Sequence, residues 1–333
     1  MSRILLVAIM SIFLSCNINH SNNYKTTGSI ERIDSSLNVI ISENAKVEII
    51  SEGFDWCEGP LWIENQKMLI FSDVPANTIY KWTEEKGKEI YLTPSGYTGT
   101  IPRGGETGSN GLVLRKDGKL VLCQHGNRQM AWMDADLANP KPVYKTIAGF
   151  YQSKKFNSPN DAVYRSNGDL FFTDPPYGLE KNMEDSLKEI PFQGVYKVTS
   201  SGEVKLLIDS ITRPNGIAFM PGEKTLIIAN SDPDKKRWYA FDIDTNDSLI
   251  NQRIFYDASS SPTTEKGLPD GMKIDKKGNV FASGPGGVWI FNKEGKHLGK
   301  IKLSEAASNC ALSADEKTLY ITNDMYVLRV KLR

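Results

Sequence analysis

Residues 267–284 read GLPDGMKIDKKGNVFASG, a short turn that carries one acid, Asp270, followed by two runs in which apolar and polar residues alternate. Alternation with a period of two is typical of β-strands. The pair Lys277-Gly278 between the runs suits a tight hairpin, because such turns need residues that tolerate positive φ. The stretch therefore predicts a two-stranded hairpin with an acid at its start.

The same pattern recurs along the chain: a small turn with a polar tip, then Gly or a small residue, then an alternating strand. The six tips are Glu58 in EGPLW, Asn110 in SNGLVL, Asn160 in SPNDAV, Asn215 in RPNGIAF, Asp270 in LPDGMKI and Asn309 in SNCALS. Successive tips lie 39 to 55 residues apart, and aromatic-rich runs such as TIYKWT and GVWIFNK follow the hairpins. A period of about 50 residues that holds four strands indicates β-propeller blades.

We therefore predict an all-β protein, a six-bladed β-propeller with four-stranded blades. The chain ends in VLRVKLR, only three strands after the last tip, so AKVEII at 45–50 is expected to supply the missing outer strand and close the ring. The charged stretch 179–193 interrupts a blade, as either a short helix over the rim or a surface loop. Convincing helical periodicity is absent from the sequence.

The first residues differ from all that follow. Arg3 precedes an apolar run over 4–14 and then Ser15-Cys16, which predicts a signal peptide over 1–16 of the lipoprotein type, with Cys16 lipidated; simple secretion is the alternative. Residues 17–44 are expected to form a flexible tether, and 45–333 a single propeller domain. The predicted location is the periplasm or surface of a bacterium, with membrane contact only through the lipid anchor.

Composition limits the kinds of partner. The chain has 333 residues, 40% of them hydrophobic, and a formal net charge of zero, so it can bury a large core and is not expected to bind nucleic acid. No obligate protein partner is evident. Cys57, Cys123 and Cys310 lie far apart beside apolar positions, which indicates buried thiols or one disulfide with a free thiol.

Convergence of the tips at one rim of the ring would bring Glu58, Asn160, Asn215 and Asp270 together. Two carboxylates and two amide oxygens are hard ligands that suit Ca²⁺, Mg²⁺ or Mn²⁺, although carboxylates also hold Zn²⁺. Turn chemistry explains any single tip equally well. Two acids and several Asn at equivalent positions favour a metal site.

Several motifs occur together in a specific order, namely EGPLW, SNGLVL, LCQHGNR, FNSPNDAVY, FFTDPPYG, RPNGIAF, LPDGMKID and GNVFASGPGGVWIF. With them the chain resembles the gluconolactonase/SMP-30/regucalcin family from about Glu52 onward, and most closely its bacterial gluconolactonase-like branch. The resemblance implies a six-bladed propeller that holds one divalent metal ion in its channel, Ca²⁺ first among the candidates, and hydrolyses sugar lactones.

Carried over by position, the resemblance places metal ligands at Glu58, Asn215 and Asp270, with Asn160 as a further ligand or a contact to water and substrate. It also implies that Asp270 is the general base, and Asp161 is a conceivable proton relay. The regucalcin branch has an arginine two or three residues before the equivalent of Asn160, where this chain reads FNS at 156–158. Substrate recognition is therefore expected to differ from that branch.

Candidate substrate contacts are His125, Asn110, Asp161, Arg128 and Tyr177. His125, in QHGNR, either faces the channel or is a structural histidine bonded to backbone. Arg128 and Tyr177 have packing or turn roles as their alternative. Arg103 belongs to an expected rim loop, where it either binds a hydroxylated or acidic ligand or is solvated.

Three functions agree with these patterns. The first is a metal-dependent sugar lactonase, an enzyme of the carboxylic ester hydrolase class. The second is another lactone or ester hydrolase on the same scaffold, and the third is a non-catalytic propeller that binds a ligand at the cell surface and contains a metal. The sequence has no GxSxG elbow, P-loop or dinucleotide fingerprint, so it does not support serine-hydrolase or nucleotide chemistry.

Overall fold

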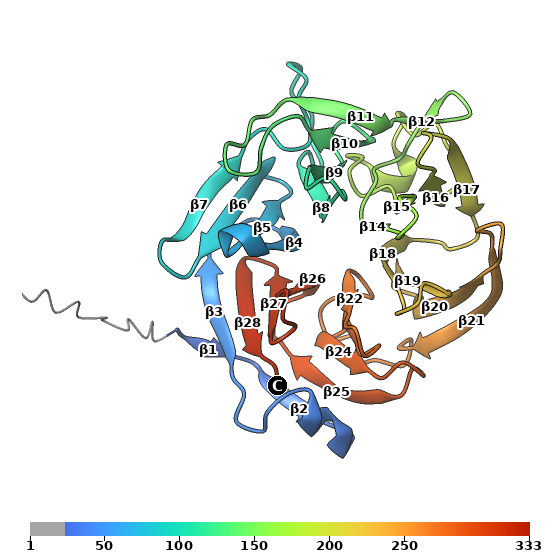
Figure 1. Ribbon diagram of the computed structural model, residues 1–333. Coiled ribbons are helices and arrows are strands. Elements are labelled where there is room, and N and C mark those ends of the chain that lie inside the picture. Colours follow the sequence, from blue (N-terminus) through green and yellow to red (C-terminus); the bar gives the residue numbers. More distant parts are fainter. Residues whose placement is uncertain (1–23) are drawn as a thin grey trace, which may run out of the picture.

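The computed structural model describes residues 24–333, and these form a six-bladed β-propeller, as predicted (Figure 1). The blades are antiparallel sheets around a central channel, and the first strand of each lies innermost. The first blade contains β4 (Cys57–Ile63), β5 (Met68–Asp73), β6 (Thr78–Thr83) and β7 (Gly87–Leu92). The second contains β8 (Ser109–Leu114), β9 (Leu120–Gln124), β10 (Gln129–Met133) and β11 (Tyr144–Ala148).

The remaining blades repeat this order. The third contains β14 (Ala162–Tyr164), β15 (Leu170–Asp174), β16 (Gly194–Val198) and β17 (Val204–Ile208), and the fourth β18 (Pro214–Phe219), β19 (Thr225–Asp232), β20 (Lys235–Ile243) and β21 (Leu249–Asp257). The fifth contains β22 (Met272–Ile274), β23 (Val280–Gly284), β24 (Gly287–Phe291) and β25 (His297–Lys302), and the sixth β26 (Ala307–Leu312), β27 (Thr318–Asn323) and β28 (Tyr326–Lys331).

The N-terminal part of the propeller closes the ring. As predicted, the early segment supplies the fourth strand of the sixth blade, because β3 (Val47–Glu52) pairs antiparallel with β28. Figure 1 shows this strand beside the C-terminal strands. No edge of the sixth blade is therefore left at β28, which removes an exposed row of unpaired backbone groups.

The segment before β3 differs from the expected flexible tether. Of its described residues, β1 (Thr26–Thr27) pairs with β3 and β2 (Ser29–Arg32) pairs with β25. The 3₁₀ helix η1 (Ser35–Val39) then places Leu37 in the core shared by the fifth and sixth blades, together with Ile40 and Ile41. The reason is that a few apolar side chains within a polar stretch bury enough surface to fix it. The predicted signal peptide, Cys16 and the start of the tether lie outside the described residues.

The core consists of apolar side chains packed between neighbouring blades. Phe281 and Ile290 of the fifth blade, for example, share a buried cluster with Leu319 and Leu328 of the sixth. Cys57, Cys123 and Cys310 are free and buried, which confirms the first of the two interpretations of the cysteines.

Two excursions interrupt the blades. A hairpin of β12 (Phe150–Tyr151) and β13 (Lys154–Lys155) follows the second blade. The charged stretch 179–193 is a surface loop with one short 3₁₀ helix, η3 (Asn182–Glu184), and it is anchored by buried Leu179 and Ile190. A further 3₁₀ turn, η2 (Glu64–Gln66), lies in the first blade. Within residues 24–333, no helix is long and apolar enough to cross a membrane.

Candidate functional site

Bulges at the start of the channel strands turn the polar tips toward the channel. The pairing of β4 with β5 changes register between Glu58 and Leu61, and that of β18 with β19 between Pro214 and Ile217. The first strands of the second and sixth blades show the same shift. Because a bulge re-aims the side chains around it, it can direct a polar residue out of an otherwise apolar strand.

Tips of adjacent blades also pack against one another through their glycines. A Cβ atom at Gly216 would lie 2.2 Å from the carbonyl oxygen of Asp270, and one at Gly271 would lie 1.9 Å from Cγ of Asn309. The Gly271 amide donates to the carbonyl oxygen of Ser308 at 2.7 Å. The glycine after the tip is therefore required by the close approach of the next blade, which fixes the spacing of the tips around the channel.

In the third and fourth blades, a side chain near the end of the second strand binds the turn that precedes the tip. The Asp174 carboxylate accepts hydrogen bonds from the amides of Asn157 and Ser158, each at 2.8 Å. Asn230 accepts one from the amide of Arg213 at 2.9 Å. Burial raises the pKa of Asp174 to about 7, although the two amides oppose the shift. These contacts make the tips parts of a rigid rim.

All four predicted metal ligands line one cavity of about 310 Å³ at this rim. Glu58, Asn160 and Asn215 are at most 3% exposed. Besides the four predicted ligands, the lining residues are Trp56, Glu106, Asn110, Tyr177, Arg213, Ser231, Gly267, Leu268, Ala306 and Ala307. The ring thus brings together side chains that are more than 200 residues apart in the chain.

Burial governs the acidity of the two predicted carboxylate ligands. It raises the pKa of Glu58 to about 8, and the pKa of Asp270 well above its usual value. Negative charge on Glu58 raises the pKa of Asp270 further, and so does charge on Asp161. A cavity that crowds acids in this way favours either protons or a cation.

The free oxygen atoms of the cavity fit a cation. The Asn215 side-chain amide donates to Oγ of Ser231 at 2.9 Å, which leaves its Oδ1 as an acceptor. Oδ1 of Asn215, Oδ1 of Asp270 and Oδ1 of Asn110 are buried and accept no hydrogen bond from the described residues. Buried acceptors without donors are unusual in proteins and are what a bound ion satisfies.

A cation at this position would need amide oxygens as well as carboxylates. Nowhere in residues 24–333 do three or more His, Cys, Asp or Glu side chains gather closely enough to hold a metal ion. Glu58 Oε2 accepts hydrogen bonds from the Gly59 amide at 2.9 Å and from Asn309 Nδ2 at 3.4 Å. Carboxylate and amide oxygens of this kind are those that hard cations prefer.

The candidate substrate contacts divide into two groups. Asn110 and Tyr177 line the cavity, and burial raises the pKa of Tyr177 to about 12. Asp161, His125 and Arg128 do not line it. Asp161 is buried beneath the rim, where its Oδ1 accepts from the Ala162 amide at 2.9 Å and its Oδ2 has no hydrogen-bond partner among the described residues.

Arg128 and Arg103 both donate hydrogen bonds to backbone carbonyl oxygens. For Arg128 this is the turn role that was the alternative to substrate binding. Nε of Arg128 donates to the carbonyl oxygen of Phe156 at 2.7 Å, in the turn before Asn160. Nη1 of Arg103 donates to the carbonyl oxygen of Gly126 at 2.8 Å, and its Nη2 donates to that of Gly178. These guanidinium groups fix loops and are not aimed at the cavity.

Among the cavity residues that were not predicted, three have charged or aromatic side chains: Trp56, Glu106 and Arg213. Trp56 and Arg213 each stand two positions before a tip, at Glu58 and Asn215, so the register of the repeats could have identified them. Glu106 lies in the irregular loop between β7 and β8, where no periodicity points to it. His125 is fully buried behind Glu106, with Nδ1 3.2 Å from Oε2 of that residue.

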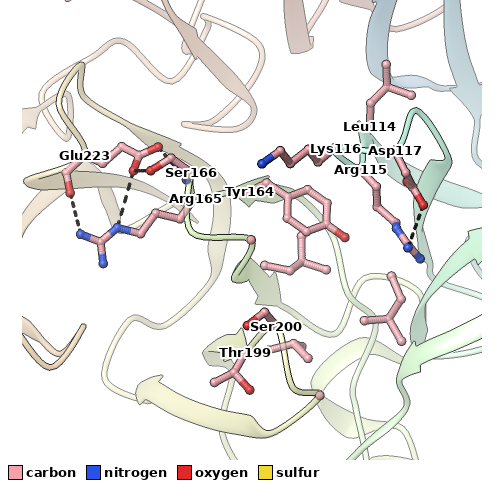
Figure 2. Close-up of a pocket in the computed structure, with 15 residues that line it drawn as sticks. Leu114, Arg115, Lys116, Asp117, Tyr164, Arg165, Ser166, Thr199, Ser200 and Glu223 are labelled. Carbon is pink, nitrogen blue, oxygen red and sulfur yellow. Dashed lines mark hydrogen bonds and ion pairs between the residues drawn. The ribbon is translucent and has the colours of Figure 1, made fainter.

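A larger cavity of about 740 Å³ lies at the turns on the far ends of the channel strands, between the second and third blades. Figure 2 shows that Arg115 pairs with Asp117 and Arg165 with Glu223. Its lining includes none of the buried acceptors without donors that the rim cavity has. The rim cavity is therefore the candidate functional site.

Known proteins share the sequence pattern and the fold of this chain. The sequence profile of the SMP-30/Gluconolactonase/LRE-like region family matches residues 56–324. A gluconolactonase from Zymomonas mobilis is 36% identical over 93% of this chain and 88% of its own length. The structure of XC5397 from Xanthomonas campestris, a gluconolactonase, superimposes with a TM-score of 0.79 at 26% identity over 96% of this chain and all of the other.

A more distant solved structure shares the fold alone. It is a regucalcin from Agrobacterium tumefaciens that is described as a calcium-binding protein. Its TM-score is 0.65 at 17% identity, over 85% of this chain and 93% of its own.

Proposed function

This chain belongs to the SMP-30/gluconolactonase/LRE family, and from that premise we propose that it is a gluconolactonase-like hydrolase that opens a sugar lactone to its hydroxy acid. The likeness to the Zymomonas mobilis gluconolactonase over nearly the whole chain supports the reaction class. The observation that carries the proposal is the meeting of Glu58, Asn160, Asn215 and Asp270 in one small cavity. A concave site with a few converging polar groups suits a small-molecule ligand.

We assign these four residues as the ligands of one divalent cation. Ca²⁺ is the first candidate, because the ligands are all oxygens and a regucalcin of the same fold is a calcium-binding protein. Zn²⁺, Mg²⁺ and Mn²⁺ are the alternatives. When bound, the cation would polarise the lactone carbonyl and stabilise negative charge on its oxygen.

The chain's own residues supply the remaining chemistry. Asp270, as a carboxylate, accepts a proton from the water whose oxygen adds to the lactone carbonyl carbon. The bond between that carbon and the ring oxygen then breaks, and the ring oxygen takes the proton from Asp270 to become a hydroxyl group of the product. Asp161, buried below the rim, is the candidate for relaying a proton away from Asp270. Arg213 in the cavity wall can donate hydrogen bonds to the substrate. The Tyr177 hydroxyl, which donates to the carbonyl oxygen of Ser231 at 3.4 Å, can accept one.

Hydrolysis of a lactone panel tests this function. Acid release from D-glucono-1,5-lactone and other lactones should need a divalent cation and stop in chelator. The variant Asp270→Asn keeps the size of the side chain but removes the base, so its kcat should fall about 10²- to 10⁴-fold. Asp117→Asn, at an exposed turn on the far face, is the matched control and should be unchanged.

Two outcomes would contradict the proposal. Hydrolysis that survives both chelation and Asp270→Asn would rule out the mechanism. Failure to turn over any lactone or ester, in a folded protein loaded with cation, would favour the non-catalytic binding propeller instead.

A further inference from the structure

Glu106 is a carboxylate in the cavity wall that neither the assigned cation ligands nor the assigned base include. It projects from the loop between β7 and β8 and lines the same cavity as Glu58 and Asp270. Its side chain is 34% exposed, so a ligand in the cavity can contact it, although it is not fully surrounded by solvent.

The loop that carries Glu106 is fixed at several points. The Tyr97 amide donates to the carbonyl oxygen of Thr107 at 2.7 Å, and the Gly108 amide donates to that of Val74 at 2.8 Å. Arg103 ties the loop to Gly126 and Gly178, which belong to the second and third blades. Glu106 therefore reaches the cavity from a loop that is held in place. A residue that orients a ligand needs such a fixed support.

His125 fixes the carboxylate from behind. Its ring is fully buried, and Nδ1 lies 3.2 Å from Oε2 of Glu106. This distance is that of an ion pair, whereas neither ring nitrogen of His125 makes a hydrogen bond among the described residues. Among the described residues Glu106 accepts no hydrogen bond and has no other ion pair, so the carboxylate keeps free lone pairs toward the cavity.

An ionised carboxylate accepts hydrogen bonds and donates none, so its natural partners in a small ligand are hydroxyl groups. We propose that Glu106, positioned by His125, accepts hydrogen bonds from the ring hydroxyls of the substrate and thereby selects polyhydroxylated lactones over unsubstituted ones. This rests on the proposed function. Arg213, which lines the same cavity, supplies donors for the oxygens that Glu106 cannot bind.

Kinetics with two lactones test the selection. For D-glucono-1,5-lactone, Glu106→Gln should raise KM about 10- to 100-fold, the usual size of a lost charged hydrogen bond, with kcat changed less. For δ-valerolactone, which has no hydroxyl groups, kcat/KM should stay within about 2-fold. Glu180→Gln is the matched control, because Glu180 is exposed beside the same loop but does not line the cavity.

Other kinetic results would overturn the inference. An equal loss of kcat/KM on both lactones would assign Glu106 to the cation or the base, and no change on either would leave it without a role.

Binding of D-gluconolactam, which an ester hydrolase does not cleave, separates this inference from the proposed function. If the wild type hydrolyses neither lactone, the proposed function fails, and lactam affinity measured by calorimetry still decides the role of Glu106. A loss of about 10-fold in Glu106→Gln supports it, whereas equal affinity, or no binding by the wild type, overturns it.

His125 is tested as a positioning residue. His125→Leu should shift KM for D-glucono-1,5-lactone in the same direction as Glu106→Gln, without an effect on δ-valerolactone. His125→Asn keeps an amide donor near the position of Nδ1 and should restore KM toward the wild-type value. If both variants fold with unchanged melting temperature and neither shifts KM, His125 has no part in placing Glu106.

Discussion

At the scale of single residues, the candidate site gathers carboxylates whose charge water stabilises poorly. Glu58 and Asp270 line the cavity, and Asp161 lies below it. Burial is the largest cause of the raised pKa of each. Burial also raises the pKa of Asp174, whose carboxylate accepts a hydrogen bond from the turn before Asn160.

These residues predict how stability depends on pH in chelator. Burial raises the pKa of Glu58 from 4.5 to about 8 and that of Asp174 from 3.8 to about 7. Because the folded state then binds more protons than the unfolded state, this stabilisation is complete below about pH 4 and is lost as pH rises through 7 to 8. The melting temperature in chelator should therefore fall between about pH 5 and pH 8.

Addition of Ca²⁺ at the upper end of this range should restore the melting temperature, because a cation binds the ionised carboxylates of the folded state. Calorimetry at several pH values, with chelator and with Ca²⁺, measures both effects. A melting temperature in chelator that rises with pH over this range would refute the expectation.

At the scale of the elements, each strand and turn is specified by local sequence. The hairpin pair Lys277-Gly278 adopts the predicted geometry, with φ of 86° at Gly278, and Gly118 has a similar φ of 80°. Gly216 and Gly271, which follow two of the tips, have a different origin. They are small because the neighbouring blade passes within van der Waals distance, which no property of the strand itself reveals.

Substitution of Gly216 tests this distinction. Gly216→Ala would place a Cβ atom 2.2 Å from the carbonyl oxygen of Asp270, so the two tips must move apart. We expect a loss of about 1–3 kcal/mol in the free energy of unfolding and a weaker affinity for the cation. Urea denaturation and cation titration measure the two effects.

The matched control is Gly149→Ala, because the nearest atom to an added Cβ there lies 3.7 Å away. Its free energy of unfolding should stay within about 0.5 kcal/mol of the wild type. Equal stability of the two variants would mean that the contact between the tips does not constrain the ring.

At the scale of the whole molecule, the ring depends on its first described residues. β3 completes the sixth blade, β1 and β2 extend the sixth and fifth, and Leu37 is fully buried between them. The chain from residue 24 onward should therefore fold and keep its melting temperature. The chain from residue 54 onward should be insoluble or unfolded, because it exposes the edges of β28 and β25.

Leu37→Ala gives a finer measure of the same closure. Removal of this side chain from the core should cost about 2–5 kcal/mol of the free energy of unfolding. Unchanged stability of either the Leu37→Ala protein or the chain from residue 54 would show that the N-terminal segment does not contribute to ring closure.

The sequence by itself determined the six blades, their hairpins, the closing strand and the polar tips, because alternation and turn chemistry are local properties that the chain carries in its order of residues. It also placed Glu58, Asn160, Asn215 and Asp270 at equivalent positions, and so predicted that they would meet. Only the tertiary structure decided which other side chains join them. Glu106 meets His125, Arg128 turns to backbone, and residues 26–41 dock on the core, because these contacts join irregular segments whose geometry depends on the packing of neighbouring blades and leaves no period in the sequence.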